Sequence, residues 1–438
     1  MRVIAQIGVY PSGGLPCGDA DHDSRQEFYA VKEYPGDSIV LVAAEHVGGN
    51  EFQLVHLGIE SRATWALGDM DRDGKADLVA RSGLDLLVYE ARDSLGYPAA
   101  LVWMDTVDHA FSKNVVIADL DRDSASEMVG VLEASPYDVW VYENRGADEY
   151  ELVCEVPDSE VPGPGNNVAE SHDMDRDGLP ELLLATDYGN VAFYEAVGDD
   201  TVELKEAVEP AAWVRANVAA THDMDGDGRP EAVVVGVDLD DMATLAICES
   251  PCGDSFAVVW LARYVGHYFG SIRIAAGDVD GDGVEEIAVA DGLRLRLLRC
   301  TGPDEYGQFW EMDGAPEILA LHDINSDGRA ELMYKAGQET VIREYTEVGV
   351  AERELRQLEG VRVVPSVVRA GVAVRMEGLE SRVSVQVLDA AGRVVAEPED
   401  GVWRTDGVSP GVYFFRFGPS AAGCQPSAVS ARKVLVVE

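Results

Sequence analysis

An acidic loop recurs seven times between residues 18 and 332, and this repetition constrains the fold more than any other feature. Each copy follows the pattern D-x-[DN]-x-D-[GS]-x-x-[DE], and successive copies begin 45 to 55 residues apart. The copies begin at Asp19, Asp69, Asp119, Asp173, Asp223, Asp278 and Asp323. Self-similarity at such a period indicates a repeat architecture, in which each unit buries apolar surface against its neighbours.

The sequence around each loop has the two-residue periodicity of β-strands. A strand is predicted before the loop (RATWALGD, 62–69), and three more follow it (for example ELLLATD, 181–187). Four short strands in about 50 residues is the spacing of a propeller blade. We therefore expect an all-β chain with a seven-bladed β-propeller over residues 1–358. Either segment 2–10 or segment 349–358 completes the seventh blade, and we favour the N-terminal one because joining the chain ends resists unravelling.

The loop pattern has the chemistry of a calcium site. Positions 1, 3 and 5 carry side-chain oxygens, position 7 offers its backbone carbonyl, and position 9 is always acidic. Glycine at position 6 permits the positive φ of a sharp turn. Two carboxylates about 4 Å apart repel by ~1 kcal/mol in water and ~4 kcal/mol at an effective dielectric of 20, so four together favour a bound cation. An all-oxygen cage suits Ca²⁺ better than Mg²⁺ or zinc.

We accordingly predict up to seven Ca²⁺ ions, one in each blade. The loops that begin at Asp19, Asp119 and Asp323 are expected to bind more weakly, because Ser24 and Ser124 replace the glycine and Asn325 replaces an aspartate. The candidate metal ligands at positions 1, 3, 5 and 9 are Asp19, Asp21, Asp23 and Glu27; Asp69, Asp71, Asp73 and Asp77; Asp119, Asp121, Asp123 and Glu127; Asp173, Asp175, Asp177 and Glu181; Asp223, Asp225, Asp227 and Glu231; Asp278, Asp280, Asp282 and Glu286; Asp323, Asn325, Asp327 and Glu331.

Three other interpretations of the loop fit the sequence less well. An EF-hand requires an acid at position 12, which is Ala80 in the second loop. A dockerin-like module would be helical and doubled. Plain solvated acidic turns also contain Asp and Gly, but the repeated convergence of four acids argues against them.

These units resemble the FG-GAP/VCBS repeats of integrin α-subunit-like propellers over residues 14 to about 357. The resemblance rests on the seven loop matches quoted above. It implies an acidic, calcium-binding loop between the first two strands of each blade.

Charge restricts the possible partners. The chain has 80 acidic and 34 basic residues and a formal charge of −46. Such a protein repels nucleic acid and anionic lipid, and no apolar stretch approaches the ~18 residues of a membrane span. The N-terminal segment is a poor match to a signal peptide. We expect no nucleic-acid partner and no membrane insertion.

Residues 361–438 have a different pattern, without acidic loops. Alternating strands predict a small Ig-like β-sandwich, with a hairpin at LDAAGRVV (388–395). The segment resembles the C-terminal sorting domains of the bacterial type IX secretion system, on Pro365, residues 389–393, residues 411–413 and residues 433–436. The resemblance implies recognition by secretion machinery and an extracellular or bacterial cell-surface location. A plain Ig-like stalk is the alternative.

No catalytic motif is present: the sequence contains no HExxH, GxSxG, Walker loop or Cys/His zinc spacing. His267 lies among aromatic residues and marks either a ligand groove or an aromatic cluster. Cys248 and Cys252 either close a small disulfide loop or remain thiols. We expect a binding or adhesion module for an extracellular protein or glycan. The alternative is a calcium-stabilised polysaccharide lyase, for which clustered basic residues are sparse.

Overall fold

The computed structural model divides the chain into two compact units, Met1–Tyr345 and Thr346–Glu438, each considered by itself below. Within residues 1–346 the structure describes all residues except 35–37, 62, 107–110, 133–138, 157–164, 171–172, 187–189, 199–200, 211–214 and 267–270. Beyond residue 346 it describes the strands given below and residues 372, 398, 405 and 408–409. The described residues contain strands and no helix, so none could span a membrane as a helix.

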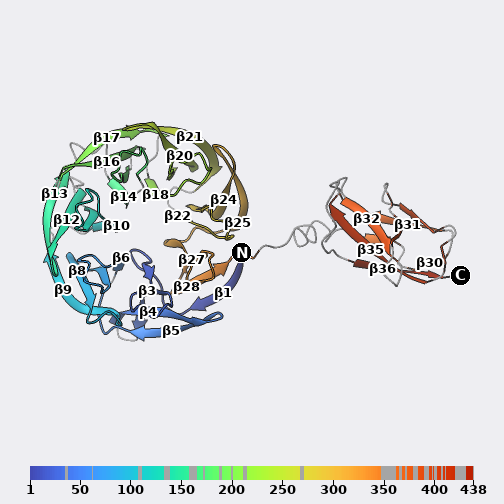
Figure 1. Ribbon diagram of the computed structural model, residues 1–438. Helices are drawn as coiled ribbons and strands as arrows, with labels where there is room; N and C mark the ends of the chain where they lie inside the picture. Colours follow the sequence, from blue (N-terminus) through green and yellow to red (C-terminus); the bar gives the residue numbers. More distant parts are fainter. Residues whose placement is uncertain are drawn as a thin grey trace. The chain divides into compact units, whose positions relative to one another are not determined.

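Seven four-stranded antiparallel sheets form a ring in the first unit, which confirms the seven-bladed β-propeller (Figure 1). In the first six blades the chain runs from the inner strand to the outer strand. These blades are β2 (Cys17–Gly18), β3 (Glu27–Tyr34), β4 (Ser38–Gly48), β5 (Glu51–His56); β6 (Ala63–Gly68), β7 (Asp77–Ser82), β8 (Asp85–Ala91), β9 (Pro98–Thr106); β10 (Phe111–Ala118), β11 (Glu127–Leu132), β12 (Val139–Gly146), β13 (Glu149–Val156); β14 (Gly165–Glu170), β15 (Leu182–Thr186), β16 (Val191–Gly198), β17 (Thr201–Val208); β18 (Arg215–Ala220), β19 (Ala232–Val237), β20 (Met242–Cys252), β21 (Ser255–Val265); β22 (Ile272–Gly277), β23 (Glu286–Asp291), β24 (Arg294–Gly302), β25 (Glu305–Asp313).

The seventh blade joins the two ends of the propeller. It contains β26 (Leu319–His322), β27 (Glu331–Ala336), β28 (Glu339–Glu344) and, as its outer strand, β1 (Arg2–Ile7). Strand β1 pairs antiparallel with β28, with Ile7 opposite Thr340. The preferred N-terminal closure is therefore confirmed; segment 349–358 lies outside the described residues.

Apolar side chains from neighbouring blades pack between the sheets. Val79 and Val88 of the second blade, for example, share a cluster with Met128 and Tyr142 of the third. The residue at position 2 of each acidic loop is at most 2% exposed, so it fixes the loop to the buried interior. These anchors are Ala20, Met70, Leu120, Met174, Met224, Val279 and Ile324.

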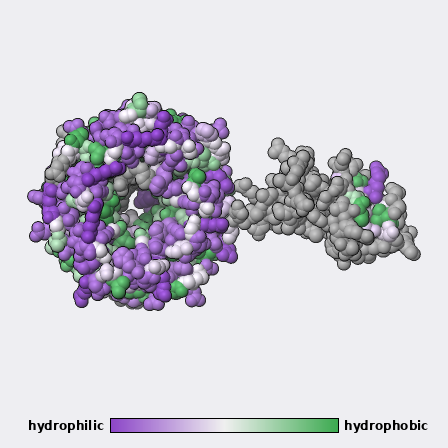
Figure 2. All heavy atoms as spheres, in the orientation of Figure 1, coloured by the Kyte–Doolittle hydropathy of each residue, from purple (hydrophilic) through white to green (hydrophobic). Residues whose placement is uncertain are grey.

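The surface of the propeller is predominantly hydrophilic in the orientation of Figure 2, with an opening at the centre of the ring. This agrees with the excess of acidic residues in the sequence. Apolar residues in this view are scattered singly among polar ones.

The second unit contains two sheets. The three-stranded sheet has β29 (Arg362–Val364), β31 (Ala373–Glu377) and β34 (Val402–Arg404); the five-stranded sheet has β30 (Val367–Arg369), β36 (Ala431–Val437), β35 (Gly411–Pro419), β32 (Val383–Leu388) and β33 (Val394–Ala396). Trp403 of one sheet contacts Tyr413 of the other, with ring centroids 5.1 Å apart. Strands β32 and β33 pair antiparallel, as predicted for the hairpin. The Ig-like classification stays a prediction.

Candidate metal centre

Each acidic loop connects the inner strand of a blade to its second strand. In the second blade, the loop begins at Asp69 directly after β6 and ends at Asp77, the first residue of β7. The paired strands hold the two ends of the loop together, and buried Met70 fixes its interior side. A rigid sheet edge therefore positions the predicted ligands.

Two backbone positions in each loop are left-handed. Position 6 has positive φ, as the glycine predicted, and Ser24 (φ 72°) and Ser124 (φ 84°) adopt it as well. Position 4 is also left-handed, which the sequence analysis missed; Arg72 there has φ 60°. Glycine occupies position 4 only in the fifth and sixth loops, as Gly226 and Gly281. Strain from non-glycine residues is therefore spread over two positions.

Backbone N–H groups inside the loop hold its carboxylates. In the second loop the Gly74 N–H donates to Asp69 Oδ2 (3.0 Å), the Asp73 N–H to Asp71 Oδ1 (3.1 Å), and the Lys75 N–H to Asp73 Oδ1 (2.9 Å). The bond from position 7 to the position 5 side chain recurs in all seven loops. These bonds leave other carboxylate oxygens free to bind a cation.

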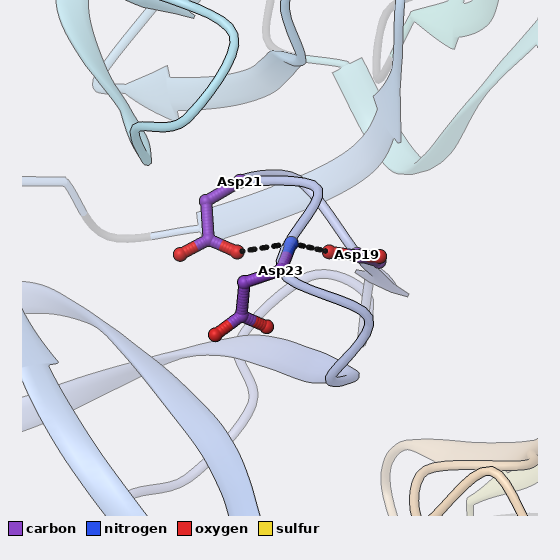
Figure 3. Close-up of side chains that lie close together, drawn as sticks. All are labelled: Asp19, Asp21 and Asp23. Atoms are coloured by element: carbon purple, nitrogen blue, oxygen red, sulfur yellow. Dashed lines mark hydrogen bonds between the residues drawn. The ribbon is translucent and has the colours of Figure 1, made fainter.

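Carboxylates at positions 1, 3 and 5 lie close together as predicted. In the first loop the Asp23 N–H donates to both Asp19 (3.0 Å) and Asp21 (3.3 Å), which draws the three residues around one turn (Figure 3). One oxygen from each of the three positions lies within 4.8 Å of the others in the first four loops. These groups are Asp19, Asp21 and Asp23; Asp69, Asp71 and Asp73; Asp119, Asp121 and Asp123; Asp173, Asp175 and Asp177.

The position 9 acid is buried and makes the same hydrogen bond in every blade. One of its oxygens accepts the backbone N–H of position 2, at 2.6 to 3.1 Å. The other oxygen is buried without a hydrogen-bond partner in Glu27 (Oε2), Asp77 (Oδ1) and Glu181 (Oε1). In the seventh loop Asn325 Nδ2 donates to Glu331 Oε1 (2.8 Å) instead.

Burial raises the pKa of every position 9 acid. The pKa of Asp77 rises to about 7 and that of Glu181 to about 8, because burial disfavours the charged form and nearby aspartates add repulsion. The other five acids shift to about 7 or 8 for the same main reason. A divalent cation would supply the charge that an ionised, unpartnered oxygen lacks, so the donor set fits Ca²⁺.

A second buried glutamate lies on the third strand of several blades and was missed in the sequence analysis. Glu45, Glu90 and Glu143 lie opposite the position 9 acids Glu27, Asp77 and Glu127 in the sheet register. Glu195 and Glu249 occupy the equivalent places in the fourth and fifth blades. The sequence signal for these residues was a glutamate that recurs after an aromatic or small residue in the third strand, as in VYEAR and VYENR.

These strand glutamates pair with basic side chains. Arg25 Nη1 lies 2.7 Å from Glu45, Lys75 Nζ lies 3.0 Å from Glu90, and Arg145 Nη1 lies 2.6 Å from Glu143. A buried carboxylate is tolerated when it is paired. The sparse basic residues of the chain therefore neutralise part of the charge next to the loops.

The two cysteines singled out in the sequence show no sign of a reactive site in the described part of the chain. Cys248 and Cys252 are free thiols, so the disulfide alternative is not realised in the structure. Burial raises the pKa of the Cys248 thiol to about 12, which makes it unreactive at neutral pH. His267 lies outside the described residues.

Comparisons with known proteins agree with this architecture. The model of the FG-GAP-like repeat family matches residues 173–234, which run from the first aspartate of the fourth loop into the strand after the fifth loop. The fold and loops together define a seven-bladed β-propeller in which this repeat is found. A search of curated proteins finds no significant match.

Solved propellers are similar to this chain in fold. A structure of BBS1N in complex with ARL6DN has a TM-score of 0.51 at 11% identity, covering 80% of this chain and 98% of that one. The WD40 domain of Toxoplasma gondii coronin has a TM-score of 0.51 at 10% identity, with 78% and 86% covered. Identities this low show the fold alone.

Proposed function

We propose that this protein is a calcium-stabilised β-propeller whose acidic loops each hold one Ca²⁺, up to seven in all. The observation that carries the proposal is the buried position 9 carboxylate beside the aspartates of the loop, whose second oxygen is unpartnered in the first, second and fourth loops. The loops beginning at Asp19, Asp119 and Asp323 bind more weakly, for the reasons of strain and missing charge given above.

The energetic role of the ions follows from linkage. If free calcium exceeds a loop's dissociation constant tenfold, that loop adds ~1.4 kcal/mol to the free energy of unfolding. Seven such loops add ~10 kcal/mol, which is comparable with the whole stability of an ordinary domain. The ions are thus a requirement of the fold in a calcium-rich compartment.

Equilibrium dialysis of the full chain against millimolar calcium tests this assignment. We expect several ions per chain, and one fewer in Asp173→Asn, which removes the position 1 carboxylate of the fourth loop. Asp93→Asn, in an exposed turn between β8 and β9, serves as the control and retains all ions. Absence of bound calcium in the wild type would refute the proposal.

We further propose that the propeller acts outside the cell as a binding or adhesion module for a protein or glycan. Support comes from the fold, which commonly presents loops for binding, and from the lack of a catalytic motif. The resemblance of residues 361–438 to sorting domains supports export through secretion machinery to the cell surface or medium. The acidic surface argues for partners other than nucleic acid.

A glycan array, run in calcium and combined with an assay for unsaturated uronate, separates the candidates. Retention of glycans without product indicates a lectin, and binding only to extracellular proteins indicates a protein adhesin. Formation of unsaturated uronate would replace the binding-module proposal with the polysaccharide lyase alternative.

A further inference from the structure

A second group of carboxylates lies beside the acidic loop where the second blade meets the third. It consists of Asp71 from the loop, Glu90 from β8 and Asp148 from the turn between β12 and β13. One oxygen from each lies within 4.8 Å of the others. Asp71 also belongs to the loop cluster with Asp69 and Asp73, so the two clusters share one carboxylate.

The same three-part arrangement recurs at two other blade junctions. At the junction of the fourth and fifth blades, Lys205 Nζ lies 2.7 Å from Glu195 and 3.7 Å from Asp254, which places Asp254, in the turn between β20 and β21, beside Glu195. The charge of Asp254 also contributes to the raised pKa of Asp175 at loop position 3. At the junction of the fifth and sixth blades, the Asp304 N–H donates to Asp225 Oδ2 (3.0 Å). After burial, the charge of Asp304 is the largest cause of the raised pKa of Glu249. In all three cases the following blade supplies the third acid.

Each of these clusters contains one basic side chain, which does not satisfy all of its carboxylate oxygens. Lys75 Nζ lies 3.0 Å from Glu90, Lys205 Nζ lies 2.7 Å from Glu195 and 3.7 Å from Asp254, and Arg229 Nη1 lies 4.0 Å from Glu249. Glu195 and Glu249 are each 3% exposed, and Glu195 Oε2 and Glu249 Oε1 are buried without a hydrogen-bond partner. At the junction of the second and third blades Asp148 Oδ1 is buried without a hydrogen-bond partner, and so is Asp77 Oδ1 of the adjoining loop site. Leaving such an oxygen ionised without a donor or cation is unfavourable.

Two other junctions differ from these three in the groups that stand at the equivalent places. In the sixth blade Arg299 takes the place of the strand glutamate, and its guanidinium lies 3.4 Å from Asp280 at loop position 3. In the first blade both oxygens of Glu45 are satisfied, one by Arg25 and the other by the hydroxyl of Tyr97. Asp280 Oδ1 is still buried without a hydrogen-bond partner, whereas the group around Glu45 is fully satisfied.

Charge balance at the junction of the second and third blades calls for more than one divalent ion. Six carboxylates lie around one ammonium group, that of Lys75, which leaves a formal charge of minus five. An ion in the loop reduces this to minus three, and a second divalent ion reduces it to minus one. The six carboxylates belong to Asp69, Asp71, Asp73, Asp77, Glu90 and Asp148.

We propose that each of these three junctions holds an additional Ca²⁺, bound by the loop position 3 aspartate, the strand glutamate and the turn aspartate of the following blade. The inference rests on the calcium function proposed above, because the position 3 aspartate is shared with the loop site. Whereas a loop ion contacts one blade, the junction ion joins two. The donors are all carboxylate oxygens, which Ca²⁺ favours.

The combined variant Asp148→Asn, Asp254→Asn and Asp304→Asn of the full chain tests the proposal. Equilibrium dialysis against calcium is expected to find three fewer ions per chain than in the wild type. Glu149→Gln with Glu305→Gln is the control and keeps the wild-type number, since these exposed acids directly follow Asp148 and Asp304 as the first residues of β13 and β25.

The outcomes separate this inference from the function on which it rests. If the wild type binds no calcium, the proposed function fails. If the wild type binds calcium and the asparagine variant binds the same number of ions, only the junction sites are refuted.

Thermal unfolding of the combined variant is a second readout, independent of ion counting. In metal-depleted buffer the variant is expected to melt above the wild type, because three repelling charges are gone. Addition of millimolar calcium is expected to raise the melting temperature of the variant by less than it raises that of the wild type. A lower melting temperature in metal-depleted buffer would show that the turn acids stabilise the fold without an ion and would contradict the proposal.

Discussion

The hydroxyl of Tyr306 in the sixth blade donates a 3.2 Å hydrogen bond to Glu231 Oε1 in the fifth blade. Glu231 is the position 9 acid of its loop, and its other oxygen accepts the Met224 N–H at 2.9 Å. The neighbouring blade therefore completes the hydrogen bonding of a proposed metal ligand. Loop chemistry and blade packing are coupled at this junction.

Tyr306→Phe tests that coupling. The substitution leaves Glu231 Oε1 buried without its donor, so we expect the metal-free protein to lose about 1–2 kcal/mol of unfolding free energy. Urea denaturation measures the change. In a Glu231→Gln background the carboxylate is absent and the loss should shrink; an equal loss in both backgrounds would show that the bond contributes nothing.

Serine at loop position 6 should weaken the first and third loops. Ser24→Gly and Ser124→Gly remove a side chain from left-handed backbone, and each is expected to stabilise the protein by about 1 kcal/mol and to tighten calcium binding at its loop. The reciprocal change Gly74→Ser, at φ 87°, is the control and should have the opposite effect on the second loop. Calcium titration with urea denaturation measures both quantities, and changes of the same sign in the two directions would contradict the account.

The raised pKa values of the position 9 acids predict an unusual pH dependence without metal. Their pKa lies at about 7 or 8 in the folded chain, against about 4.3 for an unperturbed glutamate. Between those values the folded state binds more protons than the unfolded state, so the free energy of unfolding falls as pH rises. The metal-free protein should therefore be more stable near pH 5 than near pH 8.

Calcium is expected to reverse that pH trend, because protons compete with the ion for the same carboxylates. Urea denaturation at several pH values, in metal-depleted buffer and in calcium, gives the comparison. Chelators are avoided here since they lose affinity in acid. A metal-free stability that rises from pH 5 to pH 8 would show that the position 9 acids remain ionised in the folded chain.

Closure of the ring by β1 predicts the effect of removing it. Deletion of residues 1–7 leaves one side of β28 unpaired, so we expect a clear fall in melting temperature. A peptide of residues 1–10, added in trans, should restore part of the loss. Arg2→Gln breaks only the exposed ion pair with Glu344 and should change stability by no more than ~0.5 kcal/mol. A deletion that melts like the wild type would contradict this role.

Much of the propeller could be predicted from the sequence because its central feature is local and periodic. The loop pattern gives the blade number, and the positive φ at position 6 follows from Gly74 and its equivalents. The left-handed backbone at position 4 could not be predicted in the same way, because most loops have a residue other than glycine there, such as Arg72 and Arg122.

Contacts between blades could not be predicted from the sequence, for a different reason. Asp148 and Asp71 lie 77 positions apart in the chain, and only the ring geometry brings a turn of one blade over the loop of the previous one. Strand glutamates such as Glu90 were overlooked because acids in strands usually face solvent. Their burial follows from the facing sheet of the next blade.

The most direct test of the central claim is thermal unfolding of the full chain in millimolar calcium, with and without excess chelator at neutral pH. We expect a large fall in melting temperature when calcium is removed. Added calcium should restore the melting temperature, and magnesium should restore it only partly. The same melting curve in both buffers would contradict the claim that bound calcium stabilises the ring.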